Sequence, residues 1–353
     1  MIITISLIVM VVILVGIITS NKDNVTYAVG DTLASVVINQ SKGTTWSSGA
    51  SGVYNTIYTK ENSTTIGSDY RYIGANVKNY VKFNNDMYQI IGVFDENTHG
   101  ESGQQLVKLI RARILGDFSW GVYNSSATSG TYSSYQNDWT GKQNATAANL
   151  NILLNQYFLN KTDISTIYGS CSDWTYFNSD NNYKTKDCQT LVGYGIDASI
   201  RDYIETTTWH LNGCIGNGLT SNNFYLCERG MYTGCTSANS GGGDTATSAK
   251  IGLMYVSDYT YASGYNANTT TLESNTPYKG IQNWMFKGDE WTITPKSSSD
   301  TNVFAVLNAV SSPASFYGLG IRPTFYLKED VYVTGGTGSF DNPYTISCDT
   351  CTE

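Results

Sequence analysis

The chain contains few charged side chains. Lys, Arg, Asp and Glu make up 14% of its 353 residues, against about 25% in an average globular protein, and the formal net charge is −8. No basic stretch with interleaved aromatic residues occurs. Nucleic acid is therefore a poor candidate partner, because binding it requires a concentrated positive surface. Solubility must come from Asn, Ser, Thr and Tyr.

Histidine is equally scarce, since only His99 and His210 occur. The sequence therefore offers few residues that could form a histidine-based triad or a zinc site. We predict a solvated turn around His99 and a helix end at His210, where a cation suits the helix dipole. Asp180 and Asp187 could offer oxygen ligands to calcium, but their segment lacks the Gly and terminal Glu of an EF-hand, so a plain loop is favoured. We expect no cofactor and no bound metal.

Proline is also rare, with 5 residues, whereas the chain has 34 Gly and 27 Tyr. This balance is typical of many short strands joined by turns rather than of a helical bundle. Hydrophobic residues at 41% and aromatic residues at 13% can build a core, so disorder is not expected. No repeat of about 20–50 residues is visible, which sets solenoids and propellers aside.

One long apolar run extends from Ile2 to Ser20 and carries no charge. At about 1.5 Å per residue, a helix of this length approaches the roughly 30 Å hydrocarbon core of a bilayer. We predict a transmembrane signal anchor at residues 1–20, hence a single-pass cell-membrane protein with an extracellular C-terminal domain. No Ala-x-Ala cleavage site follows, and the nearest charge, Lys22, lies on the wrong flank for an N-in anchor, so we expect a truncated or alternative start.

Cysteine is absent from the first 170 residues and then occurs seven times. In an extracellular protein these residues are expected to form disulfides. The disulfide candidates are Cys171, Cys188, Cys214, Cys227 and Cys235. We expect Cys171 to pair with Cys188 and two of the other three to pair, although spacing does not fix the connectivity. Cys348 and Cys351 form a Cys-x-x-Cys motif, for which a structural role is favoured over a redox role because no strand-to-helix junction surrounds it.

The rest of the chain divides by composition. Residues 21–68 are rich in Ser, Thr, Gly and Asn, and we predict a polar stalk or linker there. We predict one folded domain at 69–346 and a C-terminal tail at 347–353. The domain begins with two β-rich runs, 79–83 and 87–94, around an Asn-Asn-Asp turn typical of a hairpin. A third strand is expected within 105–115.

Helical periodicity follows in two places. The spacing predicts an amphipathic helix over 147–159 and a second over 197–207. The stretches 165–190 and 212–248 resemble loops. After 250 we expect a short helix through Ala262, capped near Ser257, followed by strands in the remaining residues. Strands, two or more helices and then strands again predict an α+β domain with mainly antiparallel strands and long loops.

Several segments together resemble a family of uncharacterised bacterial surface proteins. They include Tyr72-Ile-Gly-Ala-Asn, Ile251-Gly-Leu-Met-Tyr-Val-Ser-Asp-Tyr, Trp291-Thr-Ile-Thr-Pro and Gly320-Ile-Arg-Pro-Thr-Phe-Tyr-Leu. The resemblance spans about residues 70–346 and departs from the family at Val256, where Pro is expected. It implies an N-terminal anchor followed by a domain similar to the C-type-lectin-like or formylglycine-generating-enzyme-like fold. Such folds hold irregular loops that bind ligands, and catalysis is not implied.

The resemblance implies that the binding face lies in the terminal stretch, where lectin-like folds present it. The binding candidates there are Trp284, Asn308, Phe316 and Tyr317, because aromatic planes stack on sugars or peptides and Asn both donates and accepts hydrogen bonds. We expect Trp291 to lie in the core, and Arg322 to be an inward donor to a carboxylate or carbonyls.

The leading hypothesis is a cell-surface binding protein, an adhesin or receptor-like module without catalytic activity, whose partner is an extracellular glycan or protein. A minor pilin-like subunit of a surface filament is the first alternative, although the Gly-Phe-Thr-x-x-Glu start of such subunits is missing. A secreted enzyme on the same fold is the second. Formylglycine-type oxidases use paired cysteines on terminal strands, and this chain has no cysteine between Cys235 and Cys348, which argues against that chemistry.

Overall fold

The structure is a computed structural model of the whole chain. It describes thirteen stretches of residues, and every structural statement below concerns these alone. They are 28–47, 49–121, 138–140, 147–161, 175–177, 183–185, 194–216, 218–232, 246–264, 283–297, 302–307, 309–311 and 318–351.

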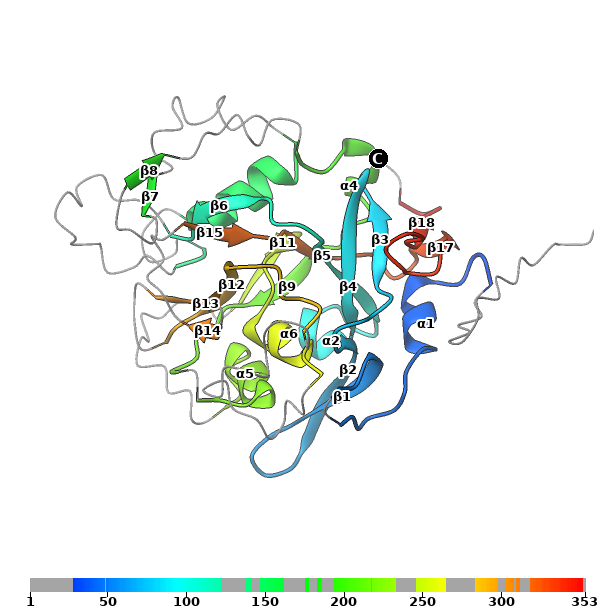
Figure 1. Cartoon of the computed structure of the whole chain (residues 1–353), viewed down its shortest axis with the longest axis horizontal. Coiled ribbons are helices and arrows are strands. Elements are labelled where there is room, and N and C mark those ends of the chain that lie inside the picture. The colour runs from blue at the N-terminus through cyan, green and yellow to red at the C-terminus, as the bar shows by residue number, and fades with distance from the viewer. Residues whose placement is uncertain are drawn as a thin grey trace, which may run out of the picture.

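The larger of two main sheets has seven strands, and every neighbouring pair in it is antiparallel (Figure 1). In spatial order they are β1 (Gly52–Thr59), β2 (Thr65–Ile73), β4 (Asp86–Phe94), β5 (Leu106–Arg111), β16 (Thr324–Tyr326) and β11 (Ile251–Gly252), with β3 (Tyr80–Phe83) paired to β4. The sheet thus unites strands from both ends of the chain.

The second main sheet has five strands, and its β12–β15 pair is parallel. Its order is β14 (Ala309–Ser311), β13 (Val303–Leu307), β12 (Glu290–Pro295), β15 (Gly318–Ile321) and β6 (Gly116–Ser119). Three two-stranded pairs complete the strands: β9 (Thr207–His210) with β10 (Ala246–Ala249), β17 (Tyr332–Gly335) with β18 (Thr345–Ser347), and β7 (Thr175–Phe177) with β8 (Tyr183–Thr185).

The described helices are short. They are α1 (Leu33–Ile38), α2 (Glu96–His99), α3 (Asn149–Ile152), the π-helix η1 (Leu153–Phe158), α4 (Ala198–Arg201), α5 (Ser221–Glu228) and α6 (Val256–Tyr261). Figure 1 shows α5 and α6 between the two main sheets and α1 beside β17 and β18. One continuous hydrophobic cluster draws side chains from both sheets and from α1. The class is therefore α+β with mostly antiparallel strands and few helices.

The predicted hairpin is confirmed as β3 and β4. Asn84 and Asn85 between them have φ of 54° and 57°, the left-handed conformation that a tight hairpin turn requires and that Asn tolerates. The third predicted strand is β5, and strands follow β12 as expected.

The helix predictions are confirmed only in part. The helix expected over 147–159 is present as α3 and η1, whereas that over 197–207 ends at Arg201 because β9 begins at Thr207 and pairs with β10. The helix near 257 begins one residue earlier, at Val256, with Tyr255 as its N-cap. The predicted loop at 212–248 contains α5, which Thr220 caps through its side chain.

The predicted stalk is wrong over its described part, 28–47 and 49–68. Leu33, Val36 and Val37 on α1 are fully buried, and β1 pairs along its whole length with β2. Asn222 closes the other edge of β1, since its side chain accepts from Thr59 N (3.1 Å) and donates to Thr59 O (2.8 Å). The buried face of β1 is itself polar, because Thr56 and Tyr58 are buried with their hydroxyls donating to the backbone oxygen of Asp69 (2.9 Å) and to its carboxylate (2.6 Å).

The predicted N-terminal anchor and the predicted C-terminal tail have different outcomes. The proposed anchor, 1–20, lies outside the described residues, and within the described stretches no helix combines the length and apolarity needed to span a bilayer. The predicted tail packs on the domain, because Ser347 belongs to β18, which pairs with β17, and Tyr332 donates from its hydroxyl to the carboxylate of Asp349 (2.7 Å). A disulfide within the tail joins Cys348 to Cys351.

Candidate functional site

A cavity of about 540 Å³ lies where loops from four parts of the chain meet. Its lining residues are Gly49, Ser51, Ala75, Asn76, Val77, Tyr80, Gln89, Asn283, Trp284, Phe286 and Lys287. They come from the segment before β1, the β2–β3 connection, the facing strands β3 and β4, and the segment before β12. The volume falls in the range of small-molecule and sugar sites in proteins, about 300–1,000 Å³.

The β2–β3 connection is fixed by Gly74, which has φ of +101°. A Cβ at this position would lie 2.0 Å from the carbonyl oxygen of Ala50, so only glycine lets the two segments approach. Gly74 also donates to Ala262 O (2.9 Å) and accepts from Trp284 N (3.0 Å). Ser51 Oγ donates to Asn76 O (2.9 Å), which joins two walls of the cavity directly.

The segment before β12 is held from inside the protein. Asn283 donates to Tyr259 O (2.8 Å) and accepts from Met285 N (2.9 Å). Arg322 is buried and donates to Met285 O (2.6 Å) and, through two nitrogens, to the carboxylate of Glu290 (2.6 and 2.8 Å). A wall anchored by such a two-pronged ion pair is organised before any ligand arrives.

The cavity presents aromatic rings, amides and one cation. Tyr80 and Phe286 are partly exposed, and Lys287 is exposed and makes no ion pair with a described residue. Gln89 donates to Asn79 Oδ1 (3.1 Å), while its buried Oε1 has no hydrogen-bond partner among the described residues. Rings that stack, amides that both donate and accept, and a free ammonium together suit a polar ligand that carries an apolar ring face.

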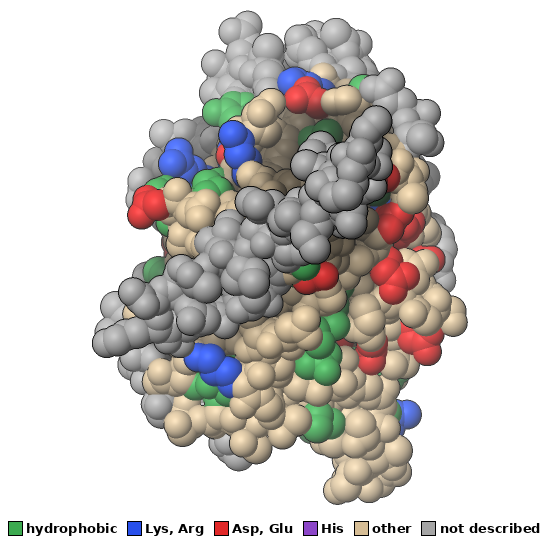
Figure 2. All heavy atoms as spheres, turned by 90° about the vertical axis from the view of Figure 1, so that its right-hand side faces the viewer, with side chains coloured by type: hydrophobic (Ala, Val, Ile, Leu, Met, Phe, Trp, Pro, Cys, Tyr) green, Lys and Arg blue, Asp and Glu red, His purple; other side chains and the backbone are tan. Residues whose placement is uncertain are grey.

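Figure 2 shows the face at the right of Figure 1, on whose described part acidic side chains gather toward one edge and hydrophobic side chains form small separate patches. The described part of this face thus presents no large apolar surface.

The predicted binding residues have different outcomes. Trp284 lines the cavity but is only 4% exposed, and its indole nitrogen donates to Tyr72 O (2.8 Å). Asn308, Phe316 and Tyr317 lie outside the described residues. Trp291 is buried and donates to Phe118 O (2.8 Å).

Sequence reasoning missed Tyr80, Gln89, Phe286 and Lys287 as lining residues. The available signal was the cluster Trp284-Met-Phe-Lys-Gly288 ahead of a strand, because aromatic and basic residues just outside a strand often face a site. No local signal shows that this segment meets the β3–β4 hairpin.

A second unusual feature is a group of six buried charged side chains in the core. The cations are Arg71, Lys108 and Arg229, and the anions are Asp69, Glu228 and Asp258. Asp258 joins two of the cations, accepting from Arg71 Nη1 (2.8 Å) and Lys108 Nζ (2.7 Å). Such groups are retained in a core only when paired, because an unpaired buried charge is very costly.

Burial and pairing set the protonation of this group. Burial raises the pKa of Asp258, but the charges of Lys108 and Arg71 outweigh it and lower that pKa to about 2. Burial lowers the pKa of Lys108 to about 8 against the attraction of Asp258, and raises that of Asp69 to about 6 against the attraction of Arg71. At neutral pH the central pair is thus ionised.

Aromatic rings surround these cations. Arg229 lies 3.6 Å from the ring centre of Tyr225, Arg71 lies 4.5 Å from that of Phe94, and Lys108 lies 4.5 Å from that of Tyr255. The geometry of these six charged side chains supports a structural role, because they join β2, β5, α5 and α6 around one set of cation–π contacts.

Both histidine predictions are wrong. His99 is buried on α2, where Nδ1 accepts from Glu101 N (3.1 Å) and Nε2 therefore carries the proton and donates to Phe94 O (3.0 Å). Burial lowers the pKa of His99 to about 4. His210 lies on β9, and burial with repulsion from Arg229 and Lys108 lowers its pKa to about 3. Both rings are neutral at pH 7, so neither histidine supplies a cation to a helix end.

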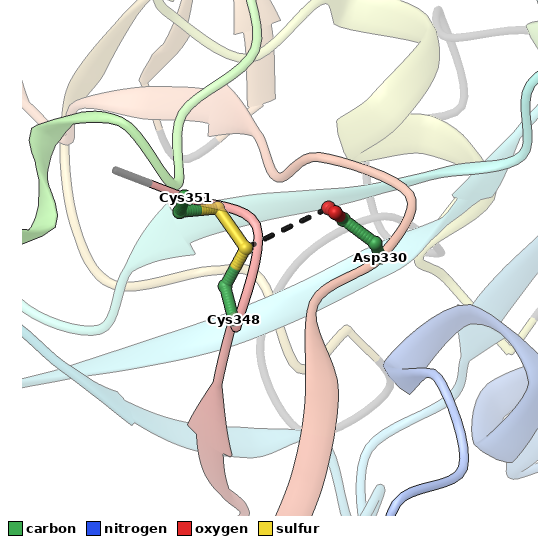
Figure 3. A group of neighbouring side chains, drawn as sticks. All are labelled: Asp330, Cys348 and Cys351. Atoms are coloured by element: carbon green, nitrogen blue, oxygen red, sulfur yellow. Dashed lines mark hydrogen bonds between the residues drawn. A yellow bond between two sulfur atoms is a disulfide. The ribbon is translucent and has the colours of Figure 1, made fainter. Parts of the chain in front are cut away.

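The disulfide candidates have different outcomes. Cys214 is a free, buried thiol, which the expectation that two of Cys214, Cys227 and Cys235 pair allows, and burial raises its pKa well above the ordinary value. Cys227 is disulfide-bonded. Cys171, Cys188 and Cys235 lie outside the described residues. The described disulfide, Cys348–Cys351, was expected to be structural and lies against Asp330 (Figure 3).

Searches for similar proteins give no match: no family model, no curated protein and no solved structure corresponds to this chain. The class that the fold and the cavity define is therefore an α+β protein with a preformed polar and aromatic site.

Proposed function

We propose that this chain is a membrane-anchored, extracellular ligand-binding protein rather than an enzyme, and that the cavity around Tyr80 and Phe286 holds its ligand. The observation that carries the proposal is the combination of partly exposed rings, amides and Lys287 around a space of about 540 Å³. A glycan fits this chemistry best, because a sugar offers an apolar face for stacking and hydroxyls for amides. A ligand carboxylate would pair with Lys287.

Location is the second part of the proposal. The uncharged run Ile2–Ser20 anchors the chain in the cell membrane. Disulfides at Cys227 and at Cys348–Cys351 support an oxidising compartment, because such bonds persist mainly outside the cytosol.

The fold is the third part. We infer a C-type-lectin-like domain, supported by the mainly antiparallel sheets and by the Gly-Ile-Arg-Pro segment, whose Arg322 fixes the segment before β12. In such a domain irregular connections, rather than strands, form the recognition surface. The walls contributed by 75–77 and 283–287 are connections of this kind.

The experiment is a glycan and peptide array probed with the full chain and with Tyr80→Ala and Phe286→Ala. Tyr194→Ala is the matched control, because this ring is 49% exposed and does not line the cavity. We expect glycan signals that both cavity variants reduce at least about tenfold, as for a central contact, and that the control retains. Signals that all three variants retain would place the ligand elsewhere, and a peptide-only pattern would replace the glycan as ligand.

A further inference from the structure

The C-terminal disulfide has an environment that a purely structural cross-link does not need. Cys348 is 7% exposed, whereas Cys351 is partly exposed, so only one of the two sulfurs is readily reached from solvent. Asp330, from the connection between β16 and β17, points its carboxylate at the buried sulfur (Figure 3). The distance from Cys348 Sγ to Asp330 Oδ1 is 3.6 Å.

This contact differs between the two redox states. A disulfide sulfur carries no proton, so in the oxidised protein Asp330 gains no hydrogen bond from it. In the dithiol the Cys348 S–H donates to the carboxylate, and this hydrogen bond to a charged group favours the reduced form. Thr350 Oγ1 lies 3.7 Å from the same sulfur and can donate to it when it is a thiolate.

Cys351 is partly exposed whereas Cys348 is buried, so the sulfur of Cys351 is the one open to attack from solvent. A second cavity of about 600 Å³ borders Asp330, but its lining includes neither cysteine. Among the described residues, which end at 351, no helix starts at the Cys-x-x-Cys motif after β18, so no helix dipole acts on the thiols there. The charged group that contacts the Cys348 sulfur is Asp330.

We propose that Cys348–Cys351 is a redox-active disulfide that oxidises external thiols, with Asp330 as the positioning residue that holds the proton of Cys348. The thiolate of one thiol, RSH, attacks Cys351 Sγ. The S–S bond breaks and its electron pair stays on Cys348. This thiolate takes a proton from water, and the resulting S–H donates a hydrogen bond to Asp330. A second RSH attacks the sulfur of the bound R group, releases RSSR and leaves Cys351 as the second thiol.

The balance of the reaction is two thiols oxidised to one disulfide RSSR and one protein disulfide reduced to two thiols. In reverse, the Cys348 S–H, held by its hydrogen bond to Asp330, returns its proton to water as this sulfur attacks the mixed disulfide on Cys351. The proposal is independent of the cavity around Tyr80, whose lining shares no residue with this site.

The test is a redox titration of the full chain in buffers of varying reduced and oxidised glutathione, followed by acid quenching and alkylation. Trypsin cleaves after Lys328, and the resulting peptide, 329–353, contains Cys348 and Cys351 as its only cysteines. Its mass therefore reports this disulfide alone, whatever the state of the others. We expect half-reduction within the glutathione range, as for labile rather than structural disulfides.

Variants separate the role of Asp330 from general charge effects. We expect Asp330→Ala to lower the equilibrium constant for reduction about fivefold, the effect of one lost hydrogen bond, and Asp330→Asn to restore part of it through its remaining acceptor oxygen. Glu329→Gln, the neighbouring carboxylate, is the control and should leave the constant unchanged. A disulfide that stays oxidised at every glutathione ratio, or an equal effect of Asp330→Ala and Glu329→Gln, would overturn the proposal.

Discussion

Replacing Asp258 with Asn tests the buried charge group most sharply. The substitution keeps the shape of the side chain but removes the charge that pairs Arg71 Nη1 at 2.8 Å and Lys108 Nζ at 2.7 Å, and all three side chains are at most 1% exposed. Breaking a buried pair by removing one partner costs about 3–5 kcal/mol, because the remaining charge is left uncompensated.

A further contribution comes from the start of α6. Asp258 Oδ2 accepts from Tyr255 N (3.0 Å), and losing a negative charge in the first turn of a helix costs about 0.3–1 kcal/mol. Together we expect a loss of about 3–6 kcal/mol, a large part of the 5–15 kcal/mol that typically separates folded from unfolded chains. Urea unfolding followed by tryptophan fluorescence measures this loss directly.

Two comparisons make the result specific. Asp197→Asn changes the same chemistry in an exposed ion pair with Lys161 and should cost less than about 1 kcal/mol. Adding Lys108→Met to Asp258→Asn removes one stranded cation and should recover about 2 kcal/mol of the loss. If Asp258→Asn costs no more than Asp197→Asn, the assignment of Asp258 as the charge that stabilises this core is refuted.

Three further predictions concern pH, boundaries and backbone conformation. His210 has a pKa of about 3 in the folded protein and an ordinary value near 6.5, so the unfolded chain binds the extra proton and stability falls as pH drops through that window. Relative to the native chain, His210→Gln should gain about 3 kcal/mol between pH 6.5 and 4 in urea titrations, and a pH-independent difference would contradict this. A fragment beginning at Asp69 lacks α1 and β1 and should fail to give the cooperative unfolding transition of a chain beginning at residue 28, whereas equal transitions would restore the stalk interpretation. Gly74→Ala should lower the free energy of unfolding by more than about 2 kcal/mol. Gly30→Ala is the control, because Gly30 has φ of +103° but no atom within 4 Å of the added Cβ, and it should cost about 1 kcal/mol. Equal losses of stability by calorimetry would show that the contact with Ala50 does not matter.

Local patterns predicted the elements whose stability is local. The β3–β4 hairpin follows from alternating apolar residues around Asn84 and Asn85, and α3 with η1 follows from helical spacing. The stalk prediction failed because β1 buries polar side chains such as Thr56 and Tyr58 and is held by β2 and by Asn222, far along the chain. Composition alone cannot distinguish such a strand from a linker.

The candidate site depends on longer-range pairing still. Arg71 and Asp258 lie 187 residues apart in the sequence, whereas periodicity predicts only contacts between residues a few positions apart. The cavity joins segments around residues 50, 76, 89 and 285, and the positive φ of Gly74 that lets them meet has no sequence signature beyond the residue itself. The sequence identifies Trp284 as an aromatic residue, whereas its burial against Tyr72 depends on the close approach of these distant segments.

The most direct test of the account is the affinity of the strongest array ligand for the full chain and for Phe286→Ala, measured by titration calorimetry with Tyr194→Ala as control. The account predicts a dissociation constant at least about tenfold weaker for Phe286→Ala and unchanged for the control. An unchanged constant for Phe286→Ala, with the ligand still bound, would contradict the claim that this cavity is the recognition site.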